Sequence, residues 1–294
     1  MSCPQQLAGV KVNNLFDNEN VKQIEEKGCF TILEHQKDYS VGPREAFVSY
    51  FMQNMNVKKR QVLVNLQGNG VKLQAGAMQW IGGDVSVDSG IKSVGGFLKN
   101  AVKGLATGES AAKPLYKGTG FVMLEPTYKF LFIEDVSKWP GGIVLDDGLF
   151  LACDDELKEK IVKRSNMSSA LLGGEGLFNL SLEGNGMVVL ESPVPKQELV
   201  EIELNNDTLK IDGNMAIAWS NSLEFTVESV NKSLINSGVS GEGFVNVYKG
   251  TGKVLMAPTI GGAVRDGSLP ALDYSDTPTS QGIANSLVHS LFSL

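Results

Sequence analysis

The sequence has few of the residues from which catalytic and metal sites are usually built. It contains two histidines, His35 and His289, and three cysteines that show no Cys-x-x-Cys spacing. Two histidines are too few for a multi-histidine metal site and offer little basis for a histidine-based catalytic triad. The cysteine spacing predicts neither a zinc site nor a disulfide framework. Motifs for phosphate-binding loops, nucleophile elbows and zinc proteases are also missing. We expect a protein that is not an enzyme and that uses no cofactor or metal.

Positive charge and long apolar runs are equally scarce. The chain has 26 Lys and Arg against 33 Asp and Glu, a net charge of −7, which makes nucleic acid an unfavourable partner. No run of 18 apolar residues occurs, and the first residues lack the basic start and apolar stretch of a signal peptide. We predict a cytoplasmic protein without a membrane span. The basic run Lys58 to Arg60 is predicted to be a solvated edge beside a strand.

Glycine, in contrast, is abundant, with 33 residues, and four glycine-centred motifs share one form. They read LQGNG at 66–70, YKGTG at 116–120, LEGNG at 182–186 and YKGTG at 248–252; the last three are spaced by 66 residues. A Gly-Glu pair precedes each of these three, and apolar segments that turn at a glycine occur at 71–80, 143–152 and 209–219. Asn-Gly and Thr-Gly between apolar runs favour tight hairpins over a phosphate-binding loop, which needs a following helix.

These spacings predict an all-β fold, with a β-sandwich-like body of three pseudo-symmetric repeats of about 66 residues. The expected organisation is an N-terminal extension with a short helix over 1–45, the β domain over 46–258, and a C-terminal tail over 259–294. Short helices are predicted at 18–27 and 43–55. The second carries Phe47, Tyr50 and Phe51 on one side, and both helices are expected to cap the β body.

Further short helices are expected at the repeat corners, at 89–108, 158–173 and 228–241. In the first of these, Phe97, Leu98, Val102 and Leu105 form a helical apolar stripe, and they are the candidate residues for partner contact. The alternative is that the stripe packs on its own sheet. In the tail, the apolar residues Leu287, Leu291 and Phe292 are expected to dock on the body or on a second subunit.

Four segments together resemble the family called altered inheritance of mitochondria protein twenty-four. They are AGAMQW at 75–80, GGFLKNAVKGLATGES at 95–110, GGEGLFNLSLEGNGMVVLES at 173–192 and LKIDGNMAIAWSNSLEF at 209–225. The resemblance spans roughly residues 46 to 258. It implies a pseudo-threefold β-sandwich-like body of the tryptophan RNA-binding attenuator type without an established catalytic residue. Mitochondrial members of the family are tied to organisation of the inner membrane.

The function predicted first is that of a non-enzymatic scaffold or binding protein. It would present the repeat-corner loops to a protein partner or a membrane surface, as a homo-oligomer. The alternative is a small-molecule binding or sensing protein with a pocket in the β-sandwich. RNA binding by analogy of fold is a third possibility, weakened by the acidic charge.

Two further hypotheses concern residues that the repeats make equivalent. Glu109, Glu175 and Glu242 would meet around a pseudo-threefold axis and bind a cation there, or each would accept backbone hydrogen bonds within its own loop. Trp80 and Trp219 end equivalent segments and are predicted to be core residues.

Overall fold

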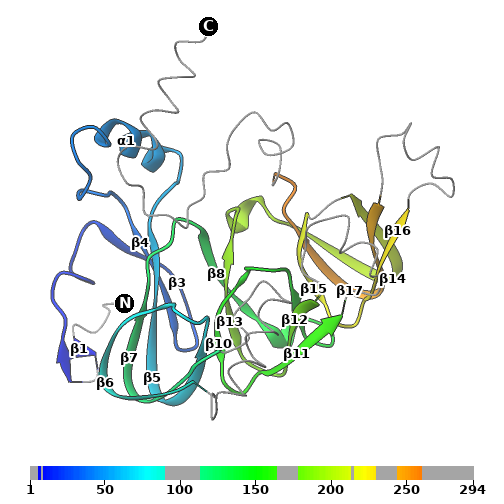
Figure 1. The fold of residues 1–294 in the computed structure, drawn as a ribbon, viewed down its shortest axis with the longest axis horizontal. Coiled ribbons are helices and arrows are strands. Elements are labelled where there is room, and N and C mark those ends of the chain that lie inside the picture. Colours follow the sequence, from blue (N-terminus) through cyan, green and yellow to red (C-terminus); the bar gives the residue numbers. More distant parts are fainter. Residues whose placement is uncertain are drawn as a thin grey trace, which may run out of the picture.

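The computed structural model describes residues 6–7, 9–89, 113–163, 178–212, 215–229 and 244–259. In these ranges the chain is mostly β-structure, as predicted, with one α-helix (Figure 1). Along the chain, β3 to β7 form the part at the left of Figure 1, β8 to β13 the centre, and β14 to β17 the right. Within the described part of the chain, no helix is long and apolar enough to cross a membrane.

The elements are short, apart from the four long strands β5, β6, β14 and β17. The bounds of all the elements, in chain order, are β1 Gln6–Leu7, β2 Val10–Lys11, β3 Val21–Lys27, β4 Phe30–His35, α1 Ala46–Asn54, β5 Arg60–Leu73, β6 Met78–Asp88, β7 Leu115–Leu124, β8 Phe130–Asp135, η1 Val136–Lys138, β9 Ile143–Leu145, β10 Phe150–Asp154, β11 Lys158–Lys163, β12 Phe178–Glu183, β13 Met187–Ser192, η2 Lys196–Glu198, β14 Val200–Asp212, β15 Ala216–Ser220, β16 Glu224–Ser229 and β17 Phe244–Met256.

Two curled antiparallel sheets carry the fold. The first has the strand order β3-β4-β5-β10-β13-β8, with β7 paired to β5 and β6 paired to β7. The second has the order β11-β12-β9-β15-β17-β14, with β16 also paired to β17. One apolar cluster lies between the sheets and includes Trp139, Phe150 and Leu182. Two more clusters fill the concave sides, around Phe30 and Val64 in the first sheet and around Trp219 and Tyr248 in the second.

The first sheet curls until its two ends, β3 and β8, meet through side chains. The backbone N–H of Ile133 on β8 donates to Glu25 Oε2 at 3.1 Å, and the Ile133 carbonyl accepts from Lys27 Nζ at 2.8 Å. Lys27 and Glu25 themselves form an ion pair at 2.6 Å. An exposed strand edge has unpaired backbone groups that invite another strand, and here two charged side chains occupy part of that edge.

The prediction of a helix at 18–27 is wrong, because residues 21–27 form strand β3, which pairs with β4. The segment is rich in Glu and Lys, and its intrinsic preference for helix gives way to pairing within the sheet. The helix predicted at 43–55 is confirmed as α1. Of the second corner segment, the described part Lys158–Lys163 is strand β11 rather than helix.

The hairpin interpretation of the Gly-x-Gly motifs is also wrong. Three of the motifs lie inside the continuous strands β5, β7 and β17, and the fourth connects β12 of the second sheet to β13 of the first. Their first glycines, Gly68, Gly118, Gly184 and Gly250, all have positive φ, between 91° and 137°. At Gly68 the register between β5 and β7 shifts, which is the signature of a β-bulge. The motifs therefore bend strands instead of reversing them.

The strands around β7 and β17 pair in the same way. β5 lines one side of β7 and β6 the other; β14 lines one side of β17, and β15 and β16 the other. Trp80 lies opposite Met123, and Trp219 opposite Val254. Trp219 is buried, and Trp80 is half-buried against the edge of the Phe121 ring, with 4.9 Å between ring centroids. The threefold repeat and the domain boundaries remain predictions.

Candidate functional site

The outward face of α1 is a feature of the described surface that a monomeric fold does not require. Phe47 is 72% exposed and Phe51 51%, whereas Ser49, on the opposite face, is only 8% exposed. Amphipathic helices normally turn their apolar face inward. Here Ser49 faces the protein together with the partly buried Val48, Met52 and Gln53, and the aromatic residues face outward. The aromatic side of the predicted helix therefore does not pack on the β body.

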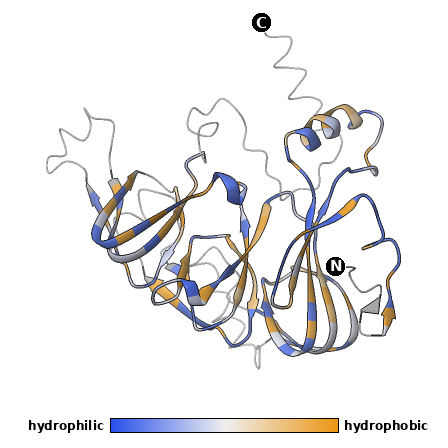
Figure 2. Cartoon of the chain, turned by 180° about the vertical axis from the view of Figure 1, so that it is seen from behind, coloured by the Kyte–Doolittle hydropathy of each residue, from blue (hydrophilic) through white to orange (hydrophobic). Residues whose placement is uncertain are grey.

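The aromatic rings on α1 contact one another and form one continuous surface. The ring centroids of Phe47 and Phe51 are 4.7 Å apart, and those of Tyr50 and Phe51 are 5.5 Å apart, both pairs with edge-to-face geometry. Met55 extends this surface by one turn and is 75% exposed. We call these four residues the α1 aromatic face. Figure 1 shows α1 beyond the end of β4, and in Figure 2 the ribbon of this helix includes both hydrophobic and hydrophilic residues.

The C-terminal end of α1 has a defined backbone geometry. Asn56 takes the left-handed conformation with φ of 63°. Its amide donates to the carbonyl of Gln53 at 3.3 Å, and the amide of Val57 donates to the carbonyl of Met52 at 2.8 Å. This pair of bonds is the Schellman motif, which satisfies the free carbonyls at a helix end. Asparagine is the residue other than glycine that most readily adopts this conformation.

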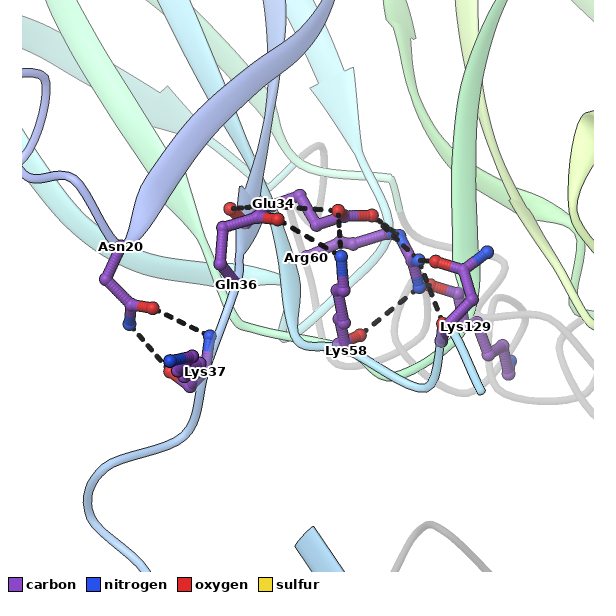
Figure 3. A network of polar contacts seen from close by, with 8 residues as sticks. Asn20, Glu34, Gln36, Lys37, Lys58, Arg60 and Lys129 are labelled. Carbon is purple, nitrogen blue, oxygen red and sulfur yellow. Dashed lines mark hydrogen bonds and ion pairs between the residues drawn. The ribbon is translucent and has the colours of Figure 1, made fainter. Parts of the chain in front are cut away.

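A buried arginine holds the same turn in place (Figure 3). Arg60 is only 2% exposed and lies opposite Glu34 in the register between β5 and β4. Its Nη2 is 2.8 Å from Glu34 Oε2. The same nitrogen donates to Asn56 at its backbone oxygen, 3.2 Å, and at its Oδ1, 2.9 Å. Its guanidinium also stacks on the ring of Phe130, 4.4 Å from the centroid.

The neighbouring lysines are engaged as well. Lys58 Nζ lies 3.1 Å from Glu34 Oε1, and Lys59 Nζ lies 2.6 Å from Asp38 Oδ2. Burial by itself would raise the pKa of Glu34, but hydrogen bonds from Lys58 and Gln36 and the charge of Arg60 hold that pKa below its ordinary value. The prediction that Lys58 to Arg60 form a solvated edge is therefore wrong for Arg60. We call the paired side chains next to α1 the ionic anchor: Glu34, Asp38, Lys58, Lys59 and Arg60.

Sequence patterns did not predict the ionic anchor, because the register between strands β4 and β5 brings Glu34 and Arg60 together. Glu34 and Arg60 are 26 residues apart in the sequence, and no spacing rule relates them. A sequence signal does exist, since the basic run ends at the first residue of β5 and the apolar residues of that strand begin at Val62. An arginine at the entry to a buried strand needs a carboxylate partner when it is desolvated.

The described cysteines are not arranged for thiol chemistry. Burial, together with the nearby charge of Asp154, raises the pKa of Cys29 to about 12, and its Sγ donates to Asp154 Oδ1 at 3.6 Å. Burial raises the pKa of Cys153 as well. Because the thiolate is the reactive form, both side chains are inert thiols at neutral pH. His35, for its part, is half-buried and lies 2.8 Å from Gln61 Oε1.

The site residues predicted from the sequence lie outside the described residues. This holds for Phe97, Leu98, Val102 and Leu105, and for Glu109, Glu175 and Glu242. Among the residues that the structure does describe, no group of three or more His, Cys, Asp or Glu side chains is placed to hold a metal ion. Both hypotheses about these seven residues remain predictions.

Comparison with known proteins places the chain in a family. The family model described as Mitochondrial biogenesis AIM24 matches residues 53–259, and the chain belongs to this family. An uncharacterised protein of Streptococcus pyogenes serotype M6 is 29% identical over 206 residues, which are 64% of this chain and 77% of that protein.

A solved structure agrees with the fold. A crystal structure of a Streptococcus pyogenes protein, determined by a structural genomics consortium, has a TM-score of 0.51 with this chain at 25% identity. The match covers 69% of this chain and 89% of the other. The residues of α1 before residue 53, and the strands β3 and β4, precede the family match.

Proposed function

We propose that this member of the AIM24 family is a non-enzymatic binding or scaffold protein that holds a protein partner at the α1 aromatic face. The observation that carries the proposal is the exposed aromatic face of α1, on which Phe47, Tyr50 and Phe51 face outward while Ser49 is buried. Exposed contiguous apolar surface is costly in water and marks binding sites. Aromatic residues also dominate the energetic centres of protein interfaces.

The ionic anchor supports the proposal because it makes the surface rigid. A partner that binds a preformed helix pays little conformational entropy to order it. Arg60 fixes the turn after α1 by its bonds to Asn56, and the Schellman geometry fixes the last helical turn. An amphipathic helix that presents aromatic residues in this way is suited to a hydrophobic groove or to a second apolar helix on the partner.

A protein partner is favoured over a membrane surface by the local charge. Interfacial helices bind membranes through an apolar face flanked by basic residues that meet anionic headgroups. The segment Ala46–Met55 has no charged side chain, and nearby Lys58, Lys59 and Arg60 are each paired with a carboxylate. Presentation of the repeat-corner loops, homo-oligomerisation and a cytoplasmic location stay within the proposal as predictions from the sequence.

The test is comparative affinity capture followed by reconstitution. Three forms are used as bait in lysate of the source cell: the intact chain, Phe47→Ser/Phe51→Ser, and the matched control Val87→Ser, which removes an exposed apolar side chain on β6. We expect one protein to be retained by the intact chain and by the control. When purified, that protein should bind the double variant at least about tenfold more weakly, a loss of roughly 1.4 kcal/mol.

The other outcomes distinguish the alternatives. Equal affinity of the purified partner for all three forms would overturn the role of α1. Retention of one small molecule by all three, with no protein, would favour the pocket-containing alternative. Retention of RNA by all three would favour the nucleic-acid alternative. Circular dichroism of each form shows whether it is folded before the comparison is made.

A further inference from the structure

The sequence contains a second uncharged apolar segment, similar in length to α1 and likewise rich in apolar residues. Residues 283–294 read IANSLVHSLFSL. At 100° per residue, the seven apolar positions fall on one half of a helical projection and the five polar positions on the other. The segment contains no Lys, Arg, Asp or Glu. The α1 segment Ala46–Met55 likewise contains none, in a chain in which 20% of the residues are charged.

We infer that the segment 283–294 docks on the α1 aromatic face of its own chain. Two uncharged apolar faces, each about three turns long, are the complement that helix packing requires. Leu287 and Leu291 lie within the apolar half of the helical projection, and Phe292 lies at its edge. They would meet Phe47, Tyr50 and Phe51, whose rings already form a continuous surface. Both faces would then leave water together, without the desolvation of any charge.

The length of the intervening chain permits this contact. The last described residue, Thr259, is held by a hydrogen bond from its Oγ1 to Glu198 at 3.2 Å. The 23 residues between it and Ile283 can extend to roughly 75 Å at about 3.3 Å per residue. A compact domain of this chain length has a radius of gyration of roughly 19 Å. The segment can therefore reach any part of the molecular surface, including α1.

Docking would regulate the binding site described above, and this consequence rests on the proposed function. The segment would cover the α1 aromatic face in the absence of a partner, and a partner would have to displace it. An intramolecular competitor acts at an effective concentration set by its linker, in the millimolar range for a flexible chain. Removing the segment should therefore strengthen partner binding.

Amide hydrogen exchange measures the docking without any partner. The intact chain is compared with a chain ending at Gly282 and with the full-length variant Leu287→Ser/Leu291→Ser/Phe292→Ser. Ser286→Ala/Ser293→Ala, on the polar half, is the matched control. We expect amides of residues 47–55 to exchange at least about tenfold faster in the first two altered forms and at an unchanged rate in the control. Amides of β5 and β7 should not change in any form.

Exchange of α1 at the same rate in the intact and shortened chains would overturn the inference. So would protection of α1 that increases with protein concentration, because it would show a second copy of the chain as the occupant. Protection that appears only after phosphatidylcholine–phosphatidylglycerol vesicles are added would also overturn it. A disulfide formed between Phe51→Cys and Leu291→Cys within a monomer would support docking in the same chain. Since none of these measurements includes a partner, failure of the docking and failure of the proposed function are distinguishable.

Discussion

Arg60 joins α1 to the first sheet by donating to both oxygens of Asn56, the backbone oxygen at 3.2 Å and Oδ1 at 2.9 Å. The same guanidinium is paired with Glu34 across strands β4 and β5. The buried charge pair therefore serves two structural purposes. It joins neighbouring strands, and it sets where the helix leaves the sheet.

Removing Glu34 should be strongly destabilising. The substitution Glu34→Ala leaves the buried Arg60 charge without its carboxylate partner, and we expect a loss of about 3 to 5 kcal/mol in the free energy of unfolding. Urea denaturation measures this. The control is Glu228→Ala, which breaks the exposed ion pair with Lys210 and should change stability by less than about 1 kcal/mol. A small effect at Glu34 would show that water reaches Arg60.

Acid should weaken the molecule in part through Asp38. Burial acts against its ionisation, but hydrogen bonds from Lys59 and Ser40 and the charge of Lys59 hold the pKa of Asp38 at about 2, below the ordinary 3.8. A carboxyl group with a lowered folded pKa stabilises the fold above its unfolded pKa, and this contribution is lost as pH falls through the folded pKa. The loss therefore falls between about pH 4 and pH 2.

The substitution Lys59→Met tests this linkage. Without the ammonium group, the pKa of Asp38 should return toward its ordinary value. The drop in unfolding free energy between pH 5 and pH 2 should then be smaller by about 1 kcal/mol, a figure reduced for the partial exposure of the pair. Urea denaturation across this pH range gives the comparison, with Lys138→Met as the control. The same drop in both variants would mean that Asp38 and Lys59 are not coupled.

Gly68 and Gly118 should respond differently to alanine, although both begin a Gly-x-Gly motif. Each has positive φ, so alanine strains the backbone at either site by about 1 to 2 kcal/mol. A Cβ at Gly68 meets no atom within 4 Å, whereas a Cβ at Gly118 overlaps the carbonyl oxygen of Asp84. Thermal and urea unfolding should therefore rank Gly118→Ala as the more destabilising change by at least about 1 kcal/mol. Equal losses would show that β6 can move away from β7.

Glu25 should protect the edge of β8. In Glu25→Ala the amide of Ile133 loses its acceptor, and we expect this amide to exchange faster and the protein to lose about 1 kcal/mol of stability. Light scattering at high concentration should also rise, because an uncovered edge can pair with another strand. Glu26→Ala, one residue away and bonded to Gln23, serves as the control. Unchanged exchange at Ile133 would mean that other groups cover this edge.

The sequence predicted the β class of the fold and the position of α1, because both depend on local patterns. It did not distinguish a hairpin from a bulge at Gly68, since each needs a residue with positive φ between apolar runs. The sequence of β3 predicts a helix, but pairing with β4 and the contact of Glu25 with Ile133 hold the segment in a strand. The periodicity of α1 showed that its aromatic residues share one side, but it did not show whether that side faces the body or the solvent.

The closure of the first sheet by Glu25 and Lys27 uses residues that lie outside the family match. The family match starts at residue 53, after the two strands that bring these side chains to β8. The contacts that cover part of the edge of β8 therefore come from a segment that precedes the family match, so the match does not require a relative to share them.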